Sequence, residues 1–131
     1  MDRHKMLALA EQFLEAWNTQ DIDRVLSCYT TDLVYRDPST RGAVQGADAM
    51  RRYLSKLFGR WQMHWSLREA HLLDDGQGCA VLWHAAFRRS PDDAPIEVDG
   101  IDYVAVRDDR IARNEVCFDR AQLAPLLAVA A

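Results

Sequence analysis

The chain has 131 residues, of which 49% are hydrophobic and 27% charged, and its formal net charge is −4. These values predict one soluble globular domain over residues 1–131, and the acidic balance argues against nucleic acid as a partner. No window approaches the roughly 20 apolar residues of a membrane-spanning helix, so we expect no membrane partner. The cysteines, Cys28, Cys79 and Cys117, lack Cys-x-x-Cys spacing, which favours free thiols in a reducing cytoplasm.

The N-terminal half shows helical periodicity that one short strand interrupts. Apolar side chains recur every three or four residues over 4–18, which predicts a helix. Asp21 is typical of an N-cap, and a second, short helix is expected from there through Tyr29. The apolar run 33–36 predicts a strand, and the pattern of residues 47–58 predicts a third helix.

Beyond Gly59 apolar and polar side chains alternate, which is the periodicity of strands. We expect strands over 61–68, 79–88, 96–107 and 110–118, joined by turns rich in Asp, Gly and Pro. Asp119 is then expected to cap a C-terminal helix. Helices that are segregated from hairpin-linked antiparallel strands make an α+β fold.

The strand expected over 96–107 is apolar in its middle on both faces. One face carries Ile96, Val98, Gly100, Asp102, Val104 and Val106, and the other carries Glu97, Asp99, Ile101, Tyr103, Ala105 and Arg107. The helices can cover only one face of the sheet. We therefore expect a homodimer that packs through the outer sheet face.

Two carboxylates are the candidate catalytic groups. Asp37 ends the strand 33–36 and precedes Pro38, and proline biases the preceding residue towards an extended backbone. Asp102 lies inside an apolar strand, where burial favours the protonated acid, which can donate a hydrogen bond. Simpler interpretations remain open: Asp37 as a turn residue, and Asp102 as a buried acid satisfied by backbone groups or a nearby arginine.

The sequence gives little support for a metal or a nucleotide cofactor. The histidines show no helical i,i+4 pair, and no Cys-x-x-Cys or glycine-rich phosphate loop accompanies them. Aromatic side chains are more informative, because Trp17, Trp65, Trp83, Phe87 and Phe118 are suited to the wall of a pocket for a flat hydrophobic ligand. Each of them is equally compatible with an ordinary core position.

A set of short motifs, at residues 13–18, 29–32, 34–38, 49–53, 101–103, 110–111 and 118–119, carries a resemblance to a known family. Their order and spacing resemble the nuclear transport factor 2-like superfamily, in particular its ketosteroid isomerase and SnoaL-like polyketide cyclase branch. The likeness covers about residues 6–120. It implies a single SnoaL-like domain shaped as a cone, in which a curved antiparallel sheet wraps around N-terminal helices and encloses an apolar pocket. Dimers are common in this superfamily.

The resemblance also implies roles for the two acids. Asp37 matches the general base of ketosteroid isomerase, and Asp102 matches the second Asp, which stays protonated and donates to the substrate oxyanion. The oxyanion-hole tyrosine of that enzyme falls on Phe13, and its supporting tyrosine falls near Leu54. Neither side chain can donate a hydrogen bond. The donors that remain for this role are Tyr29, Tyr35, Tyr53 and Asn114.

A second comparison concerns limonene-epoxide-hydrolase-like members of the superfamily. They use an Arg two residues before the strand Asp and a further Asp on the last strand. Here these places hold Gly100 and Val116, which argues against epoxide hydrolysis.

We therefore expect a pocket for a small hydrophobic molecule. Its predicted lining is Phe13, Trp17, Tyr29, Tyr35, Tyr53, Leu54, Met63, Trp65, Trp83, Phe87, Val104, Asn114, Val116 and Phe118. The leading hypothesis is an acid/base isomerase or cyclase that needs no cofactor and no metal and acts on a polyketide- or steroid-like carbonyl compound. The alternative is a non-catalytic small-molecule-binding or interaction domain of the same fold.

Overall fold

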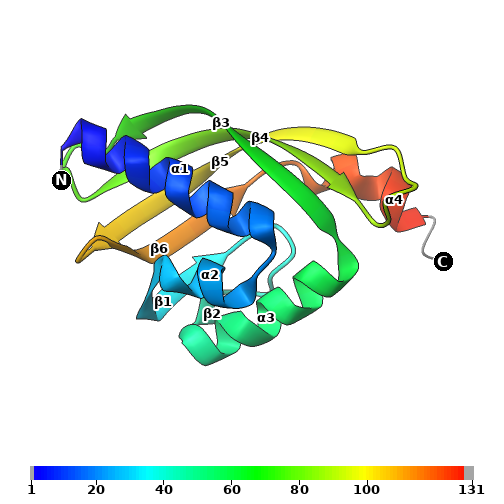
Figure 1. The fold of residues 1–131 in the computed structure, drawn as a ribbon, viewed down its shortest axis with the longest axis horizontal. Helices are drawn as coiled ribbons and strands as arrows, with labels where there is room; N and C mark the ends of the chain where they lie inside the picture. The colour runs from blue at the N-terminus through cyan, green and yellow to red at the C-terminus, as the bar shows by residue number, and fades with distance from the viewer. Residues whose placement is uncertain (1, 129–131) are drawn as a thin grey trace.

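The computed structural model describes residues 2–128, in which N-terminal helices lie along a six-stranded sheet (Figure 1). In chain order the elements are α1 (Arg3–Thr19), α2 (Ile22–Ser27), β1 (Tyr29–Arg36), β2 (Val44–Gln45), α3 (Ala47–Arg60), β3 (Gln62–Leu72), β4 (Gly78–Arg88), β5 (Ile96–Arg107), β6 (Arg110–Cys117), the 3-10 helix η1 (Arg120–Leu123) and α4 (Ala124–Ala128). The strand order is β2-β1-β6-β5-β4-β3, so the sheet has two free edges and does not close. The predicted α+β fold is confirmed.

The sheet is antiparallel except at one place. β1 runs parallel to β6, while the other neighbouring pairs are antiparallel. The alternating pattern of the sequence predicts hairpin-linked antiparallel strands and carries no sign of this parallel pair. The parallel pair brings the end of β1, and with it the loop at Asp37, next to the last strand of the sheet.

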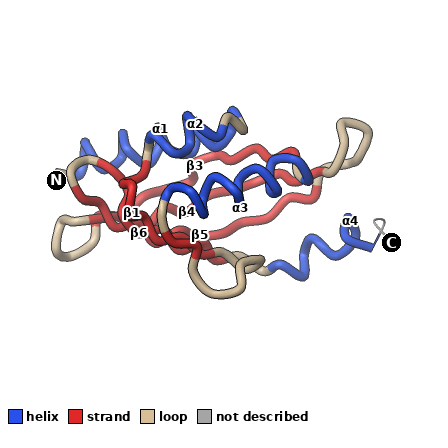
Figure 2. The backbone as a smooth tube through the Cα atoms, turned by 90° about the horizontal axis from the view of Figure 1, so that it is seen from below, coloured by secondary structure: helices blue, strands red, loops and turns tan. Residues whose placement is uncertain are grey.

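Most of the predicted elements are confirmed, and their caps explain where they begin. The Asp21 carboxylate accepts hydrogen bonds from the backbone N–H groups of Asp23 (3.0 Å) and Arg24 (3.3 Å), which starts α2. Asp119 caps η1 by accepting from the N–H of Ala121 at 3.0 Å. This C-terminal segment begins as a 3-10 helix and continues as α4, which Figure 2 shows set apart from the other helices.

Two predicted boundaries were wrong, and one short strand was not predicted. Tyr29 was expected to end the second helix but begins β1, because it pairs with Ile111 of β6. The short strand Val44–Gln45 was not predicted. β3 was expected to end at residue 68 but continues to Leu72. The prediction stopped early because a register shift between Leu67 and Glu69 interrupts the alternation of apolar and polar residues. The Tyr29–Ile111 pair joins residues far apart in the sequence and leaves no local pattern, whereas β2 pairs with the nearby residues Val34 and Tyr35.

The end of α1 is fastened to the edge strand β3 by two amide side chains. Asn18 accepts from the backbone N–H of Trp65 (2.7 Å) and donates to its carbonyl (2.9 Å). Gln20 accepts from the N–H of Met63 (2.8 Å) and donates to the carbonyl of Trp61 (2.9 Å). These bonds satisfy edge groups that would otherwise be free to pair with another chain. They also fix the strand that supplies much of the site's wall.

The face assignment predicted for β5 is correct. Val98, Asp102 and Val104 are buried against the helices, whereas Ile101 and Tyr103 on the other face are 40% and 39% exposed. Between residues 2 and 128, no helix is both long enough and apolar enough to cross a membrane.

Candidate active site

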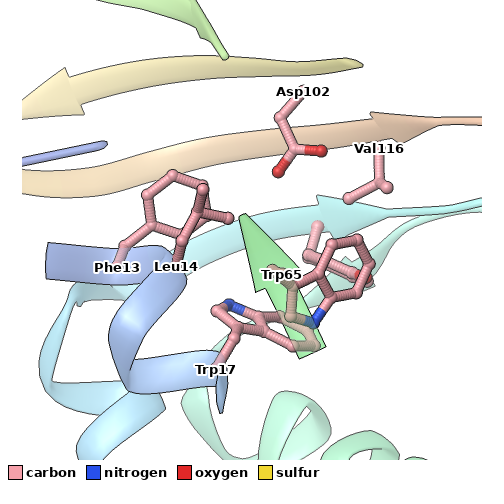
Figure 3. Close-up of a pocket in the computed structure, with 7 residues that line it drawn as sticks. Phe13, Leu14, Trp17, Trp65, Asp102 and Val116 are labelled. Carbon is pink, nitrogen blue, oxygen red and sulfur yellow. The ribbon is translucent and has the colours of Figure 1, made fainter. Parts of the chain in front are cut away.

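An inner hollow lies between α1 and the concave face of the sheet. Its cavity volume is about 20 Å³, and its wall is formed by Phe13, Leu14, Trp17, Tyr35, Trp65, Asp102 and Val116 (Figure 3). Asp102 is the acid in this otherwise largely aromatic and aliphatic wall.

An outer hollow adjoins the first. Its cavity volume is about 30 Å³, and it is lined by Trp17, Tyr35, Asp37, Ser39, Tyr53, Leu57, Trp61, Met63, Trp65, Phe87, Val116, Phe118 and Leu123. Four of these residues, Trp17, Tyr35, Trp65 and Val116, also line the inner hollow. The two acids therefore face neighbouring spaces that share an aromatic wall.

Asp102 is held by two N–H donors from neighbouring strands. Trp83 on β4 donates from its indole nitrogen to Oδ1 at 2.8 Å, and Asn114 on β6 donates from Nδ2 to Oδ2 at 3.1 Å. The first bond depends on Gly100, which is opposite Trp83 in the register. A Cβ on Gly100 would come within 2.4 Å of the Trp83 ring, so a residue without a side chain leaves room for the indole.

The second donor belongs to a chain of buried hydrogen bonds. The Trp17 indole N–H donates to the Tyr29 hydroxyl at 3.2 Å, and this hydroxyl donates to Oδ1 of Asn114 at 2.7 Å. Because the Asn114 oxygen is occupied by Tyr29, its amide nitrogen is turned towards Asp102. The chain thus fixes the orientation of the group that holds the carboxyl.

The surroundings of Asp102 favour its protonated form. Burial raises its pKa from 3.8 to about 7; the hydrogen bonds from Asn114 and Trp83 oppose this rise, and the charge of Asp37 adds to it. Both oxygens accept a bond from N–H groups, yet each carboxyl oxygen has a further lone-pair position. A protonated Asp102 can therefore accept both bonds and still donate into the hollow. A group with such a pKa can transfer a proton in either direction near neutrality.

Asp37 has a different environment. Its Oδ1 accepts from the backbone N–H groups of Ser39 (2.7 Å) and Thr40 (3.1 Å), which closes the turn after β1. Its Oδ2 accepts from the hydroxyls of Tyr35 (2.7 Å) and Tyr53. The interpretation as a turn residue is therefore correct. The same side chain also faces the outer hollow between two tyrosines.

Both tyrosines stay protonated and act as donors. Burial raises the pKa of Tyr35 and of Tyr53, and the charge of Asp37 raises each further. Burial likewise raises the pKa of Tyr29, the middle residue of the hydrogen-bond series from Trp17 to Asn114.

The other predicted pocket residues divide into two groups. Phe13, Trp17, Tyr35, Tyr53, Met63, Trp65, Phe87, Val116 and Phe118 line one or both hollows. Tyr29, Leu54, Trp83, Val104 and Asn114 are buried and do not belong to the described linings. Three of this second group, Tyr29, Trp83 and Asn114, act behind the wall by fixing Asp102.

Several lining residues were missed from the sequence: Leu14, Ser39, Leu57, Trp61 and Leu123. Leu14 and Leu57 follow the helical periodicity of α1 and α3, so the signal for burial was present, but nothing local distinguishes a core residue from a lining one. Ser39 and Leu123 come from segments whose position depends on tertiary contacts. Arg120, the first residue of η1, donates from Nε to the Ser39 hydroxyl at 3.1 Å and brings these two segments together.

The positions that argued against epoxide hydrolysis have structural roles. Val116 pairs directly with Asp102 across the sheet and lines both hollows. Gly100 lies under the Trp83 ring, where an arginine side chain would collide with it. Within residues 2–128, no three His, Cys, Asp or Glu side chains are grouped so that they could hold a metal ion.

Comparisons with known proteins agree with this architecture. The family described as SnoaL-like domain matches residues 10–114. No curated protein sequence matches the chain significantly. Among solved structures, a putative isomerase from Bacillus subtilis is 13% identical, with a TM-score of 0.85 and 98% of this chain and 96% of that chain covered.

Two further structures have named partners or reactions. TerC, co-crystallised with polyporic acid, is 18% identical with a TM-score of 0.79, and 95% of this chain and 98% of that chain are covered. SalBIII, an epoxide hydrolase/cyclase-like enzyme with a role in pyran ring formation in the polyether salinomycin, is 17% identical with a TM-score of 0.80, and 92% of this chain and 95% of that chain are covered. At these identities the likeness shows a common fold.

Proposed function

Because the chain belongs to the SnoaL-like domain family, we propose that its two hollows bind one small hydrophobic carbonyl compound and catalyse an acid/base isomerisation or cyclisation on it. The substrate class is a flat polyketide- or steroid-like ring system. The observation that carries the proposal is the pairing of Asp102 and Asp37 on adjoining hollows with a common aromatic wall. The cyclase-like and isomerase neighbours of the same fold support the reaction class.

Asp102 is the proposed donor to the developing enolate oxygen. A neutral carboxylic acid in a water-poor hollow stabilises negative charge that appears on a substrate oxygen during the reaction. Trp83 and Asn114 hold the carboxyl in place before the substrate arrives, so little reorganisation is needed. This role replaces the donor that Phe13 cannot supply.

Asp37 is the proposed proton acceptor at the outer hollow. It accepts four hydrogen bonds, so it must release one tyrosine hydroxyl before it can approach a substrate C–H group. Tyr53 is the better candidate for release, because it is only half-buried whereas Tyr35 is buried. A proton taken up by Asp37 can then return to another carbon of the same ring, which completes an isomerisation without net change in composition.

The test is proton exchange next to a ketone. β-Tetralone in deuterium oxide, followed by NMR, should exchange its acidic α-protons faster with the protein than without it. Asp102→Asn and Asp37→Asn should each slow the catalysed exchange by about 100- to 1,000-fold. Asp99→Asn, on the opposite face of β5, is the matched control and should retain the wild-type rate. Equal rates in all four proteins would contradict the assignment.

We also propose that the chain forms a homodimer through the outer sheet face. The exposed Ile101 and Tyr103 lie at the centre of this face, and the Arg113 guanidinium is 4.8 Å from the centroid of the Tyr103 ring. Apolar residues surrounded by both signs of charge suit a two-fold contact. Light scattering should give the mass of a dimer for the wild type and of a monomer for Ile101→Glu, while Leu7→Glu on α1 should stay dimeric. A monomeric wild type would contradict this proposal.

We propose the cytoplasm as the compartment in which this chemistry takes place. The support is chemical: Cys28, Cys79 and Cys117 are free thiols, and free thiols persist in a reducing environment. Fractionation of the source cells with an antibody to the chain would test it, and recovery in an oxidising compartment would contradict it.

A further inference from the structure

Trp65 carries a hydrogen-bond donor for which the described part of the chain offers no acceptor. The side chain is only 9% exposed, and its indole nitrogen is buried without a hydrogen-bond partner. The residue lines both the inner and the outer hollow, and Figure 3 shows it between Trp17 and the pair Asp102 and Val116. Buried N–H groups are nearly always satisfied in native proteins, so an unsatisfied one on a pocket wall calls for an acceptor from outside the chain.

The two neighbouring indoles, unlike that of Trp65, have hydrogen-bond acceptors within the protein. The Trp17 N–H donates to the Tyr29 hydroxyl and the Trp83 N–H donates to Asp102. The rings packed on Trp65 are those of Trp17, Trp83 and Phe87, all in edge-to-face contacts with centroid distances of 6.2, 4.5 and 5.5 Å. Aromatic faces are weak acceptors at best. The indole N–H groups of Trp17 and Trp83 therefore have acceptors within the protein, and that of Trp65 has none in the described part of the chain.

The position of Trp65 is fixed on both sides of its strand. Asn18 binds its backbone N–H and its carbonyl at 2.7 and 2.9 Å, and Ala85 of β4 pairs with it on the other side. The three surrounding rings restrict the indole itself. A donor that is immobilised before binding loses little entropy when it meets an acceptor, which is the requirement for an efficient recognition group.

We propose that the Trp65 indole N–H donates to an oxygen of the bound molecule where the two hollows meet, and so selects oxygenated ring compounds over hydrocarbons of the same shape. This inference rests on the ligand site proposed above, but it does not require that the site be catalytic. Trp65 would then be a specificity residue, in addition to the two acids. The acceptor it fits is a carbonyl, ether or phenol oxygen on a flat ring system.

The experiment compares β-tetralone with tetralin, in which a methylene group takes the place of the ketone. Calorimetric titration should show tighter binding of β-tetralone to the wild type. Trp65→Phe should weaken the binding of β-tetralone by roughly five- to tenfold, because one neutral hydrogen bond is lost. The affinity for tetralin should be nearly unchanged. Trp61→Phe removes an indole from the outer hollow and should affect the two compounds alike.

A second measurement does not depend on the variant folding. In the NMR spectrum of the wild type, the indole N–H resonance of Trp65 should shift downfield with β-tetralone and stay in place with tetralin. An unmoved resonance, an equal loss for both compounds in Trp65→Phe, or no binding of either compound would overturn the inference. If the protein selects the ketone through Trp65 but catalyses no α-proton exchange, the inference about Trp65 stands and the catalytic proposal is contradicted. The two proposals can therefore fail separately.

Discussion

The two carboxylates of the site show how differently one fold can treat the same functional group. Asp102 sits in the middle of a central strand, fully surrounded, and receives two neutral N–H donors from side chains on the adjacent strands. Asp37 sits in the loop after β1, half-buried, and receives two backbone N–H groups and two hydroxyls. Burial dominates at the first site and raises the pKa of Asp102. At the second site, local turn geometry supplies half of the donors.

This difference suggests a division of labour. An acid whose pKa is about 7 is available in its protonated form near neutrality and suits the donation of a hydrogen bond, and a carboxylate near solvent suits the acceptance and return of a proton. The difference also has thermodynamic consequences, because a buried acid with a raised pKa affects the stability of the fold.

The stability of the protein should depend on pH through Asp102. Its pKa is raised from 3.8 to about 7 in the folded state, so the folded chain holds a proton that the unfolded chain has released. The contribution is fully present below the unfolded pKa and is lost as pH rises towards the folded value. At about 1.4 kcal/mol per pH unit and proton, the full difference is on the order of 4 kcal/mol.

Urea unfolding across this window, from about pH 4 to about pH 7, measures the effect. The free energy of unfolding of the wild type should fall more steeply with rising pH than that of Asp102→Asn, which has no carboxyl to titrate there. Asp37→Asn should retain most of the steep dependence, because burial is the main cause of the raised pKa of Asp102 and the charge of Asp37 is a smaller one. Identical slopes in the wild type and Asp102→Asn would remove the distinction between the two acids.

A methyl group at Gly100 should damage the Asp102 site selectively. The new Cβ would lie 2.4 Å from two carbons of the Trp83 ring and 2.8 Å from the Cys117 carbonyl. The indole has to move, which strains the core and breaks its bond to Asp102. We expect Gly100→Ala to reduce the free energy of unfolding by about 3 kcal/mol.

Gly59 offers a matched control for this substitution. It lies within α3 and a Cβ there would meet nothing within 4 Å, so Gly59→Ala should stabilise the fold by about 0.5–1 kcal/mol. Thermal unfolding of both variants checks the pair. If Gly100→Ala were as stable as Gly59→Ala, the close packing of Trp83 over Gly100 would be refuted.

Removal of a single hydroxyl should cost more stability near the buried Asp102 than near the half-buried Asp37. Tyr29→Phe leaves the Trp17 N–H and the Asn114 oxygen without partners in the core, which should cost about 2 kcal/mol. Tyr35→Phe removes one of four donors from the half-buried Asp37, which should cost about 1 kcal/mol or less. Chemical denaturation of the two variants gives the order, and a larger loss in Tyr35→Phe would reverse our ranking of the two sites.

The sequence predicted on which strand, and on which face of it, Asp102 lies, but it did not predict which side chains donate hydrogen bonds to Asp102. Alternation along β5 correctly indicates that Asp102 faces the core. Within residues 2–128, neither a backbone group nor an arginine satisfies the carboxyl; Trp83 and Asn114 do, from strands whose register is set by long-range pairing. For Asp37 the local signal was stronger, because the Asp-Pro turn is encoded within four residues. Its Tyr53 contact depends on how α3 packs, which no local pattern specifies.

The protonation state of Asp102 can be observed directly by carbon NMR of the aspartate side-chain carboxyls during a pH titration. The structure predicts one carboxyl resonance that titrates near pH 7 and that is missing from the spectrum of Asp102→Asn. A spectrum in which every aspartate carboxyl has titrated below about pH 5, as ordinary aspartates do, would show that Asp102 is ionised at neutral pH and would contradict its role as the neutral donor.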